Sequence, residues 1–292
     1  MNLRDVAVLV EAAKSGSLAE AARRLGIPAM AASRRLAALE AEMGSRLMHR
    51  TTVASSLTAE GQEFLPFAEA MLANEEDARA ALRPPSTGAT GLLRVTTSAA
   101  FGRKIVIPMI PHFMAANPDV RVDLLMSDTI IDIVGAGFDV AIRIAPLRDS
   151  GLIARRLAAN PRALYATPAY LERRGAPKLL DDLEHHQCLT FSNATHWPIV
   201  HSEGSRRVRI RGRFSANSME GLHAACLADL GIAMLSLWDT RLEVATKALV
   251  RIDLSDGEPE PLAIWAVYPT TLLIPPKVRC FVEMLEALLR KE

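Results

Sequence analysis

The sequence predicts a helical amino-terminal part followed by an α/β domain, and three observations support this fold class. The first 83 residues are rich in alanine, contain only the prolines Pro28 and Pro66, and follow helical spacing. Between Arg83 and Gly91 the chain reads Arg-Pro-Pro-Ser-Thr-Gly-Ala-Thr-Gly, a linker that a packed helix does not tolerate. After this linker, short apolar runs alternate with helical patterns, as in α/β architectures. The 292 residues suit two or three domains.

The composition excludes several classes of protein. Half of the residues are hydrophobic and 23% are charged, so the chain buries cores and is not a disordered tail. The formal net charge is +1, so any affinity for nucleic acid must come from a local basic surface. Cys188, Cys226 and Cys280 lie far apart and form no C-x-x-C motif, which indicates neither a disulfide framework nor a zinc ribbon. Because no nucleophile elbow and no H-E-x-x-H run appears, we expect no enzyme activity, metal or cofactor.

The sequence also predicts where the protein works. No signal-peptide core follows Met1, and no uncharged run is long enough for a membrane span. The separated cysteines fit a reducing compartment. We therefore expect a cytoplasmic protein without a membrane partner.

The helical part contains a helix-turn-helix pattern. A first helix begins at Leu3, and Ser15-Gly16 ends it. A second helix, Leu18 to Leu25, and a third, Ala29 to about Met43, are joined by the tight connection Gly26-Ile27-Pro28. Two helices joined in this way predict a DNA-reading module.

The third helix carries Ser33, Arg34 and Arg35 on a turn that faces outward. From Glu20 to Arg50 the chain has six arginines against three acids. On charge alone, these arginines are better explained as the solvated face of an ordinary helical bundle. The order of the elements favours DNA binding instead, because the turn directly precedes a helix whose outer face is polar and basic.

A two-stranded wing and a long helix follow. Arg46 to Thr52 and Leu57-Thr58 predict the wing, and Thr58 is placed to cap a helix that runs to about Leu82. An apolar stripe on that helix needs another surface to cover it, and a partner chain is the simplest one. The stripe predicted for dimerisation contains Phe64, Ala68, Met71 and Leu82.

Short motifs along the whole chain match one family in combination. In the helical part they are Ala21-Ala22-Arg23-Arg24-Leu25-Gly26, Ser33-Arg34-Arg35-Leu36, His49-Arg50-Thr51-Thr52 and Leu57-Thr58-Ala59-Glu60-Gly61. In the α/β part they are Phe138-Asp139-Val140-Ala141-Ile142-Arg143-Ile144, Leu152-Ile153-Ala154-Arg155-Arg156-Leu157 and Thr167-Pro168-Ala169-Tyr170-Leu171. With these motifs the chain resembles the LysR-type transcriptional regulators.

The resemblance implies a domain organisation and a set of partners. It implies a winged helix-turn-helix in residues 1–58, a dimerising linker helix and hinge in 59–90, and an effector-binding domain in 91–292 shaped like a type-two periplasmic binding protein. Double-stranded promoter DNA, a small-molecule effector, and self-association as a dimer or tetramer are implied partners. The residues expected at the DNA are Arg23, Ala29, Met30, Ser33, Arg34, Arg35, Arg50 and Thr51.

Two departures from the family pattern bear on the DNA contacts. Many relatives carry basic residues at the wing, where this chain has Val53, Ala54 and Ser55. We therefore expect fewer phosphate contacts from the wing. Relatives also often place a polar residue early in the third helix, where this chain has Ala29 and Met30, so we expect apolar contact with thymine methyl groups there.

The α/β half is expected to form two subdomains around a cleft. The chain leaves the first near Ala159-Asn160-Pro161 and returns near Trp265, which assigns residues 91–160 and 266–292 to subdomain one and 161–265 to subdomain two. Ligands in such folds bind beyond strand ends, at helix N-termini.

Three of these helix starts converge on the predicted cleft. Ser98 opens one helix, Ser127-Asp128-Thr129 is expected to open another, and Asn217-Ser218 opens a third. Such N-termini favour an organic anion as the effector, although simple capping explains the same residues. The candidate effector residues are Ser98, Ala99, Phe101, Thr129, Phe191, Asn217 and Ser218.

Two other functions remain open on the sequence. The α/β half alone fits a small-molecule enzyme or a transport-type binding protein, but this interpretation leaves the first 83 residues unexplained. A structural dimerisation protein with an incidental basic face is the other. The leading interpretation is a DNA-binding regulator with an effector cleft.

Overall fold

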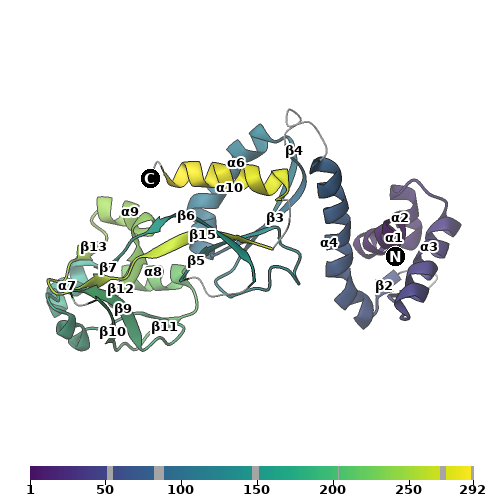
Figure 1. Cartoon of the computed structure of the whole chain (residues 1–292). Coiled ribbons are helices and arrows are strands. Elements are labelled where there is room, and N and C mark those ends of the chain that lie inside the picture. The colour runs from purple at the N-terminus through teal and green to yellow at the C-terminus, as the bar shows by residue number, and fades with distance from the viewer. Residues whose placement is uncertain (51–54, 82–88, 147–150, 203, 270–273, 291–292) are drawn as a thin grey trace.

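The computed structural model describes residues 1–50, 55–81, 89–146, 151–202, 204–269 and 274–290. Figure 1 shows a small helical domain with the amino terminus, then the long helix α4 (Ala59–Ala81), then a larger α/β domain. This arrangement confirms the predicted fold class. Two candidate residues, Thr51 and Leu82, lie outside the described residues, and so do the wing residues Val53 and Ala54.

The three predicted helices of the amino-terminal domain are present as α1 (Leu3–Ser15), α2 (Leu18–Arg24) and α3 (Ala29–Met43). Local chemistry sets their ends. Ser17 accepts a hydrogen bond from the backbone N–H of Glu20, which caps α2. The helices pack through a shared core that includes Val6, Leu9, Ala21, Ala22, Ala32, Leu36 and Leu39.

The wing is anchored to the end of α3 by a buried carboxylate. Glu40 accepts hydrogen bonds from the backbone N–H groups of Leu47 and Met48, at 3.1 and 3.2 Å from its Oε1. The strands β1 (Met48–Arg50) and β2 (Ser55–Leu57) then pair antiparallel. The wing therefore leaves α3 in a fixed direction.

Helix α4 begins as predicted but buries its stripe differently. The Thr58 hydroxyl accepts a hydrogen bond from the Gly61 N–H at 3.0 Å, as a cap does. Ala68 is fully buried in the amino-terminal core, and Phe64 packs against that core. The expectation that only a partner chain covers this stripe is therefore wrong for these two residues, because α1 of the same chain covers them. The exposed aromatic residue of α4 is Phe67, with 54% of its surface accessible.

Subdomain one is built on a five-stranded sheet in the order β4-β3-β5-β15-β6. Helices α6 (Ile107–Ala116) and α10 (Pro276–Leu289) pack beside each other on this sheet, and the rings of Phe113 and Phe281 meet edge to face at 5.5 Å. A short helix α5 (Ala99–Phe101) and a π-helical turn η2 (Gly102–Val106) lead into α6. The strands are β3 (Thr90–Thr97), β4 (Asp119–Met126), β5 (Val140–Ile144), β6 (Ile153–Asn160) and β15 (Leu262–Tyr268).

Subdomain two contains three small sheets, in the orders β12-β7-β13, β10-β9-β14 and β11-β8. Its helical elements are α7 (Pro168–Arg174), the 3-10 helix η3 (Leu180–His185), α8 (Met219–Leu227) and α9 (Leu237–Ala245). Its strands are β7 (Arg162–Ala166), β8 (Thr190–Phe191), β9 (His196–His201), β10 (Gly204–Arg209), β11 (Ser215–Ala216), β12 (Ala233–Ser236), β13 (Val250–Ile252) and β14 (Glu258–Pro259).

The chain crosses between the subdomains twice, as predicted, but the return lies earlier. It leaves between β6 and β7 and returns between β14 and β15, so Leu262 already belongs to subdomain one. The predicted return near Trp265 is wrong because β15 pairs with β5 and β6 from its first residues.

The helix expected to begin at Ser127-Asp128-Thr129 is absent, and residues 127–138 form bends and turns. Side chains compete for the backbone here: the Ser127 hydroxyl accepts from the Thr129 N–H, and Asp132 accepts from the Val134 N–H. Thr129 therefore caps no helix.

Candidate nucleic-acid interface and effector cleft

The exposed side of α3 presents a mixed apolar and basic surface. Met30 is 86% exposed, and Arg34 lies one turn further along the same face. Ala29 is exposed and Ser33 is half-buried beside them. No ion pair involves Arg34 within the described residues, so its guanidinium group is free to meet a ligand.

Several other arginines of this domain pair with acids of their own chain. Arg23 pairs with Glu20, and Arg35 approaches Asp5 at 4.0 Å between Nε and Oδ1. The side chain of Arg50, on β1, lies outside the described residues. Arg34 thus differs from Arg23 and Arg35, since it pairs with no acid in the described part of the domain.

A cleft of about 350 Å³ lies between the two subdomains of the α/β half. Subdomain one contributes Ser98, Thr129 and Arg143, whereas Arg162 and Phe191 come from subdomain two. The cleft therefore combines hydroxyl groups, guanidinium groups and an aromatic wall.

A carboxylate of the chain itself holds two helix N-termini at this cleft. Asp128 accepts from the Ala99 N–H at the start of α5 and from the Met219 N–H at the start of α8, both at 3.1 Å. These helices belong to different subdomains, so Asp128 connects them. The expectation that these N–H groups are free for an effector anion is wrong, because Asp128 already satisfies them.

Two arginines supply positive charge to the cleft. Burial lowers the pKa of Arg143, and its Nη2 atom is buried without a hydrogen-bond acceptor in the described part of the chain. Burial also lowers the pKa of Arg162 to about 10, against the opposing effect of Glu260, and its Nε donates to the Glu260 carbonyl at 2.9 Å. The Nη2 atom of Arg143 in particular lacks, within the described residues, the acceptor that a buried polar atom requires.

The structure brings together only some of the predicted effector residues. Ser98, Thr129 and Phe191 line the cleft. Phe101 is fully buried and packs edge to face on Trp238 at 5.2 Å, so it supports the cleft wall from behind. The predicted residues outside the lining are Ala99, Phe101, Asn217 and Ser218, of which Ser218 caps α8.

Sequence reasoning missed several cleft residues. Arg143 interrupts the otherwise apolar strand β5, and this break in the pattern is a signal that would have found it. Trp238 packs against the core of subdomain one and also lines the cleft. Nothing local in the sequence marks Asp128 or Arg162, because their roles depend on partners far along the chain.

Within the described ranges, no helix is long and apolar enough to cross a membrane. In the same ranges, no three His, Cys, Asp or Glu side chains gather as metal ligands.

Comparisons with known proteins match both halves of the chain. The family described as "Bacterial regulatory helix-turn-helix protein, lysR family" matches residues 3–62, and "LysR substrate binding domain" matches residues 86–290. The HTH-type transcriptional regulator DmlR of Escherichia coli (strain K12) is 33% identical, over 97% of this chain and 93% of its own length. The HTH-type transcriptional regulator CrgA of Neisseria meningitidis (serogroup C) is 29% identical, over 97% and 96%.

Solved structures agree with this match over the full length. The structure of CrgA from Neisseria meningitidis covers 99% of both chains with 29% identity and a TM-score of 0.63. The full-length virulence activator AphB of Vibrio cholerae covers 98% of this chain and 99% of its own, with 29% identity and a TM-score of 0.61.

A helix-turn-helix domain joined to a two-subdomain ligand domain defines a DNA-binding transcriptional regulator with a small-molecule-binding half. The chain belongs to the LysR family of transcriptional regulators. Its relatives are named as regulators, so the chain is a regulator and not an enzyme.

Proposed function

We propose that this regulator binds double-stranded promoter DNA in the cytoplasm as a dimer or tetramer, and that a small organic anion in the cleft changes its affinity for that DNA. The DNA contacts come from the exposed side of α3, where Met30 meets thymine methyl groups and Arg34 meets a base edge or a phosphate. Ala29, Ser33 and the wing residues Arg50 and Thr51 flank this surface in the sequence.

The observation that carries the anion proposal is the unpartnered Nη2 atom of Arg143. A buried guanidinium nitrogen without an acceptor is costly, and a carboxylate supplies two acceptor atoms in the geometry of the guanidinium fork. Arg162 adds positive charge, and the Ser98 and Thr129 side chains lie on the opposite subdomain of the same cleft. The effector's negative group is therefore expected at Arg143 and not at the helix N-termini.

Asp128 gives the cleft a means of responding to this anion. Its carboxylate connects α5 and α8 across the subdomains. A carboxylate of the effector repels the Asp128 carboxylate, and a movement of Asp128 changes the relative orientation of the two subdomains.

Self-association is expected through the exposed side of α4. Phe67 is more than half exposed, whereas Phe64 and Ala68 pack inside the chain. A second copy of α4 covers Phe67 and brings two α3 helices to one DNA.

A thermal-shift screen of small mono- and dicarboxylates tests the anion. We expect at least one acid to raise the melting temperature of the parent protein, and to raise it less in Ser98→Ala and not at all in Arg143→Met. Arg174→Met, on the exposed end of α7, is the matched control and keeps the full shift. Equal stabilisation of the parent and Arg143→Met contradicts the assigned site.

A gel shift with the DNA upstream of the protein's own gene tests the regulatory step. The stabilising acid is expected to change the affinity of the parent protein for this DNA and to leave that of Arg143→Met unchanged. An acid that stabilises the protein without changing its DNA affinity separates binding from regulation and contradicts the second half of the proposal.

A further inference from the structure

A dense group of arginines lies on subdomain two, far along the chain from the helix-turn-helix. Between Gly204 and Phe214 the chain reads Gly-Ser-Arg-Arg-Val-Arg-Ile-Arg-Gly-Arg-Phe. All five of these arginines are exposed, and no ion pair involves any of them in the residues that the structure describes. They are Arg206, Arg207, Arg209, Arg211 and Arg213.

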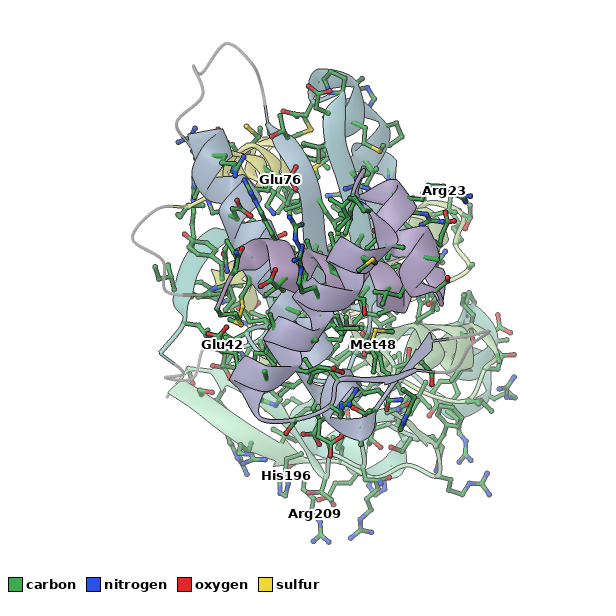
Figure 2. All side chains as sticks on the ribbon, turned by 90° about the vertical axis from the view of Figure 1, so that its right-hand side faces the viewer. Arg23, Glu42, Met48, Glu76, His196 and Arg209 are labelled. Carbon is green, nitrogen blue, oxygen red and sulfur yellow. The ribbon has the colours of Figure 1, made fainter. Side chains whose placement is uncertain are left out.

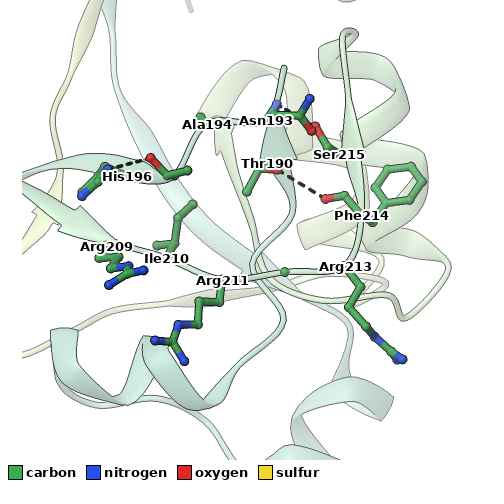
Figure 3. A pocket seen from close by; sticks show the side chains of 12 residues that line it. Thr190, Asn193, Ala194, His196, Arg209, Ile210, Arg211, Arg213, Phe214 and Ser215 are labelled. Atoms are coloured by element: carbon green, nitrogen blue, oxygen red, sulfur yellow. Dashed lines mark hydrogen bonds between the residues drawn. The ribbon is translucent and has the colours of Figure 1, made fainter.

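Four of these arginines form a row because the segment is extended. Val208 and Ile210 turn inward and pack against the core of subdomain two, so the residues between and beyond them turn outward. Figure 3 shows Arg211 and Arg213 extending to the same side of the chain. Arg207 and Arg209 lie on strand β10 (Gly204–Arg209), and Arg211 and Arg213 lie in the four residues that follow it. We call these four residues (Arg207, Arg209, Arg211 and Arg213) the arginine row.

The row lies on an open edge with little negative charge beside it. Strand β10 pairs only with β9 in its three-stranded sheet, and Figure 2 shows Arg209 and His196 at the lower edge of the molecule. A hollow of about 630 Å³ beside the row is lined by Arg209, Arg211, Arg213 and His196, among others, and by no carboxylate. Glu260 lies near the start of the strand, where Ser205 donates to it at 3.2 Å.

The residue type and the spacing favour phosphate as the ligand. All four cations are arginine, whose planar fork matches phosphate oxygens. A charged edge strand also deters aggregation, but that role asks for no particular spacing, and lysine is its usual residue. A run of four cations without an acidic neighbour in the adjoining hollow instead fits a polyanion, and the DNA backbone carries one phosphate per 3.4 Å of axis on each strand.

We propose that the arginine row is a second DNA-contacting surface, which binds the phosphate backbone of duplex DNA independently of base sequence. In Figure 1 subdomain two and the amino-terminal domain lie at opposite sides of the molecule. The row therefore holds a stretch of duplex other than the one that α3 reads. Because α3 anchors the same DNA molecule, the row acts at high effective concentration.

The test measures the binding of the full-length protein to a labelled random-sequence duplex at several salt concentrations. The row variant carries Arg207→Gln, Arg209→Gln, Arg211→Gln and Arg213→Gln. A control variant with the same change in net charge carries Arg121→Gln, Arg156→Gln, Arg174→Gln and Arg279→Gln, at four other exposed positions of the α/β half. The affinity falls as salt rises, and each lost phosphate contact makes the slope of log affinity against log salt shallower by about 0.9.

We expect the row variant to bind more weakly than the control variant at low salt, with a slope shallower by about 2 to 4. A third variant with lysine at the four row positions keeps the charge and is expected to keep most of the slope, which separates lost contacts from lost folding. If the row variant and the control variant show the same slope of log affinity against log salt, the proposal is overturned, because the change in net charge alone then explains the weaker binding. Tighter binding of the row to a poly-glutamate peptide than to the duplex also overturns it, in favour of an acidic protein partner.

Discussion

At the scale of single residues, Arg34 is an exposed arginine of α3 that pairs with no acid among the described residues. Removing it by Arg34→Ala is expected to weaken operator binding by roughly 1–3 kcal/mol, and to relax base selectivity if it reads a base edge. Arg23→Ala is the comparison, because Arg23 is already paired with Glu20 and is expected to matter less. A quantitative gel shift on both variants checks this, and equal losses contradict the distinction.

The buried cysteines give a second prediction at this scale. Burial raises the pKa of the Cys188 and Cys226 thiols to about 12, so at pH 8 both remain protonated and unreactive. In the native protein a thiol reagent such as DTNB is therefore expected to leave both unmodified, and to label them only after denaturation. Mass spectrometry of the labelled peptides identifies the sites, and rapid native labelling of Cys226 would show that its helix opens easily.

At the scale of elements, α4 decides how two chains meet. The two sides of this helix differ, since Ala68 faces the amino-terminal core and Phe67 is exposed. Phe67→Asp is therefore expected to weaken self-association while the chain stays folded. Ala68→Asp places a charge in the core and is expected to unfold the amino-terminal domain. Sedimentation and circular dichroism distinguish these outcomes, and an unchanged sedimentation coefficient for Phe67→Asp assigns the oligomer contact to another surface.

At the scale of the whole molecule, a buried charge cluster ties the subdomains together. Lys104 on η2 lies 2.7 Å from Asp239 on α9, and His223 on α8 lies 3.3 Å from the same carboxylate. Burial alone would raise the pKa of Asp239, but hydrogen bonds from His223 and Lys104 outweigh it and hold the pKa below its usual value. Because the folded pKa is lowered, the stabilisation is present above the unfolded pKa of about 3.9 and is lost as the pH falls through the folded value.

Asp239→Asn tests this cluster. At neutral pH the variant is expected to be less stable than the parent by roughly 3 kcal/mol, because Lys104 and His223 lose the carboxylate that they share and keep only Glu243, at 3.9 and 3.5 Å, as an acidic partner. Below about pH 4 the difference is expected to shrink, since the parent then loses the same charge. Urea unfolding at several pH values measures this, with the exposed Asp253→Asn as control. A difference that stays constant down to pH 3 contradicts the role of the ionised carboxylate.

Local signals in the sequence identified most of the helices and the family. Caps such as Ser17 and Thr58, and the glycines that end helices, act within a few residues of the chain. Leu36 and Leu39 follow the apolar spacing of α3 and are buried in the core of the domain, which is a local pattern of the same kind. Because such signals involve residues that are close in the sequence, they can be recognised from the sequence alone.

The contacts of the polar groups depend on the three-dimensional packing. Asp128 reaches N–H groups that are 29 and 91 residues away in the chain, and no local pattern reports such a contact. The packing of Phe64 and Ala68 of α4 against the amino-terminal core likewise depends on elements that are distant in the chain. The same is true of the position of Arg143 in the cleft. Hydrogen bonds and ion pairs act over a few ångströms in space, whereas the sequence records only separation along the chain, and packing alone relates the two.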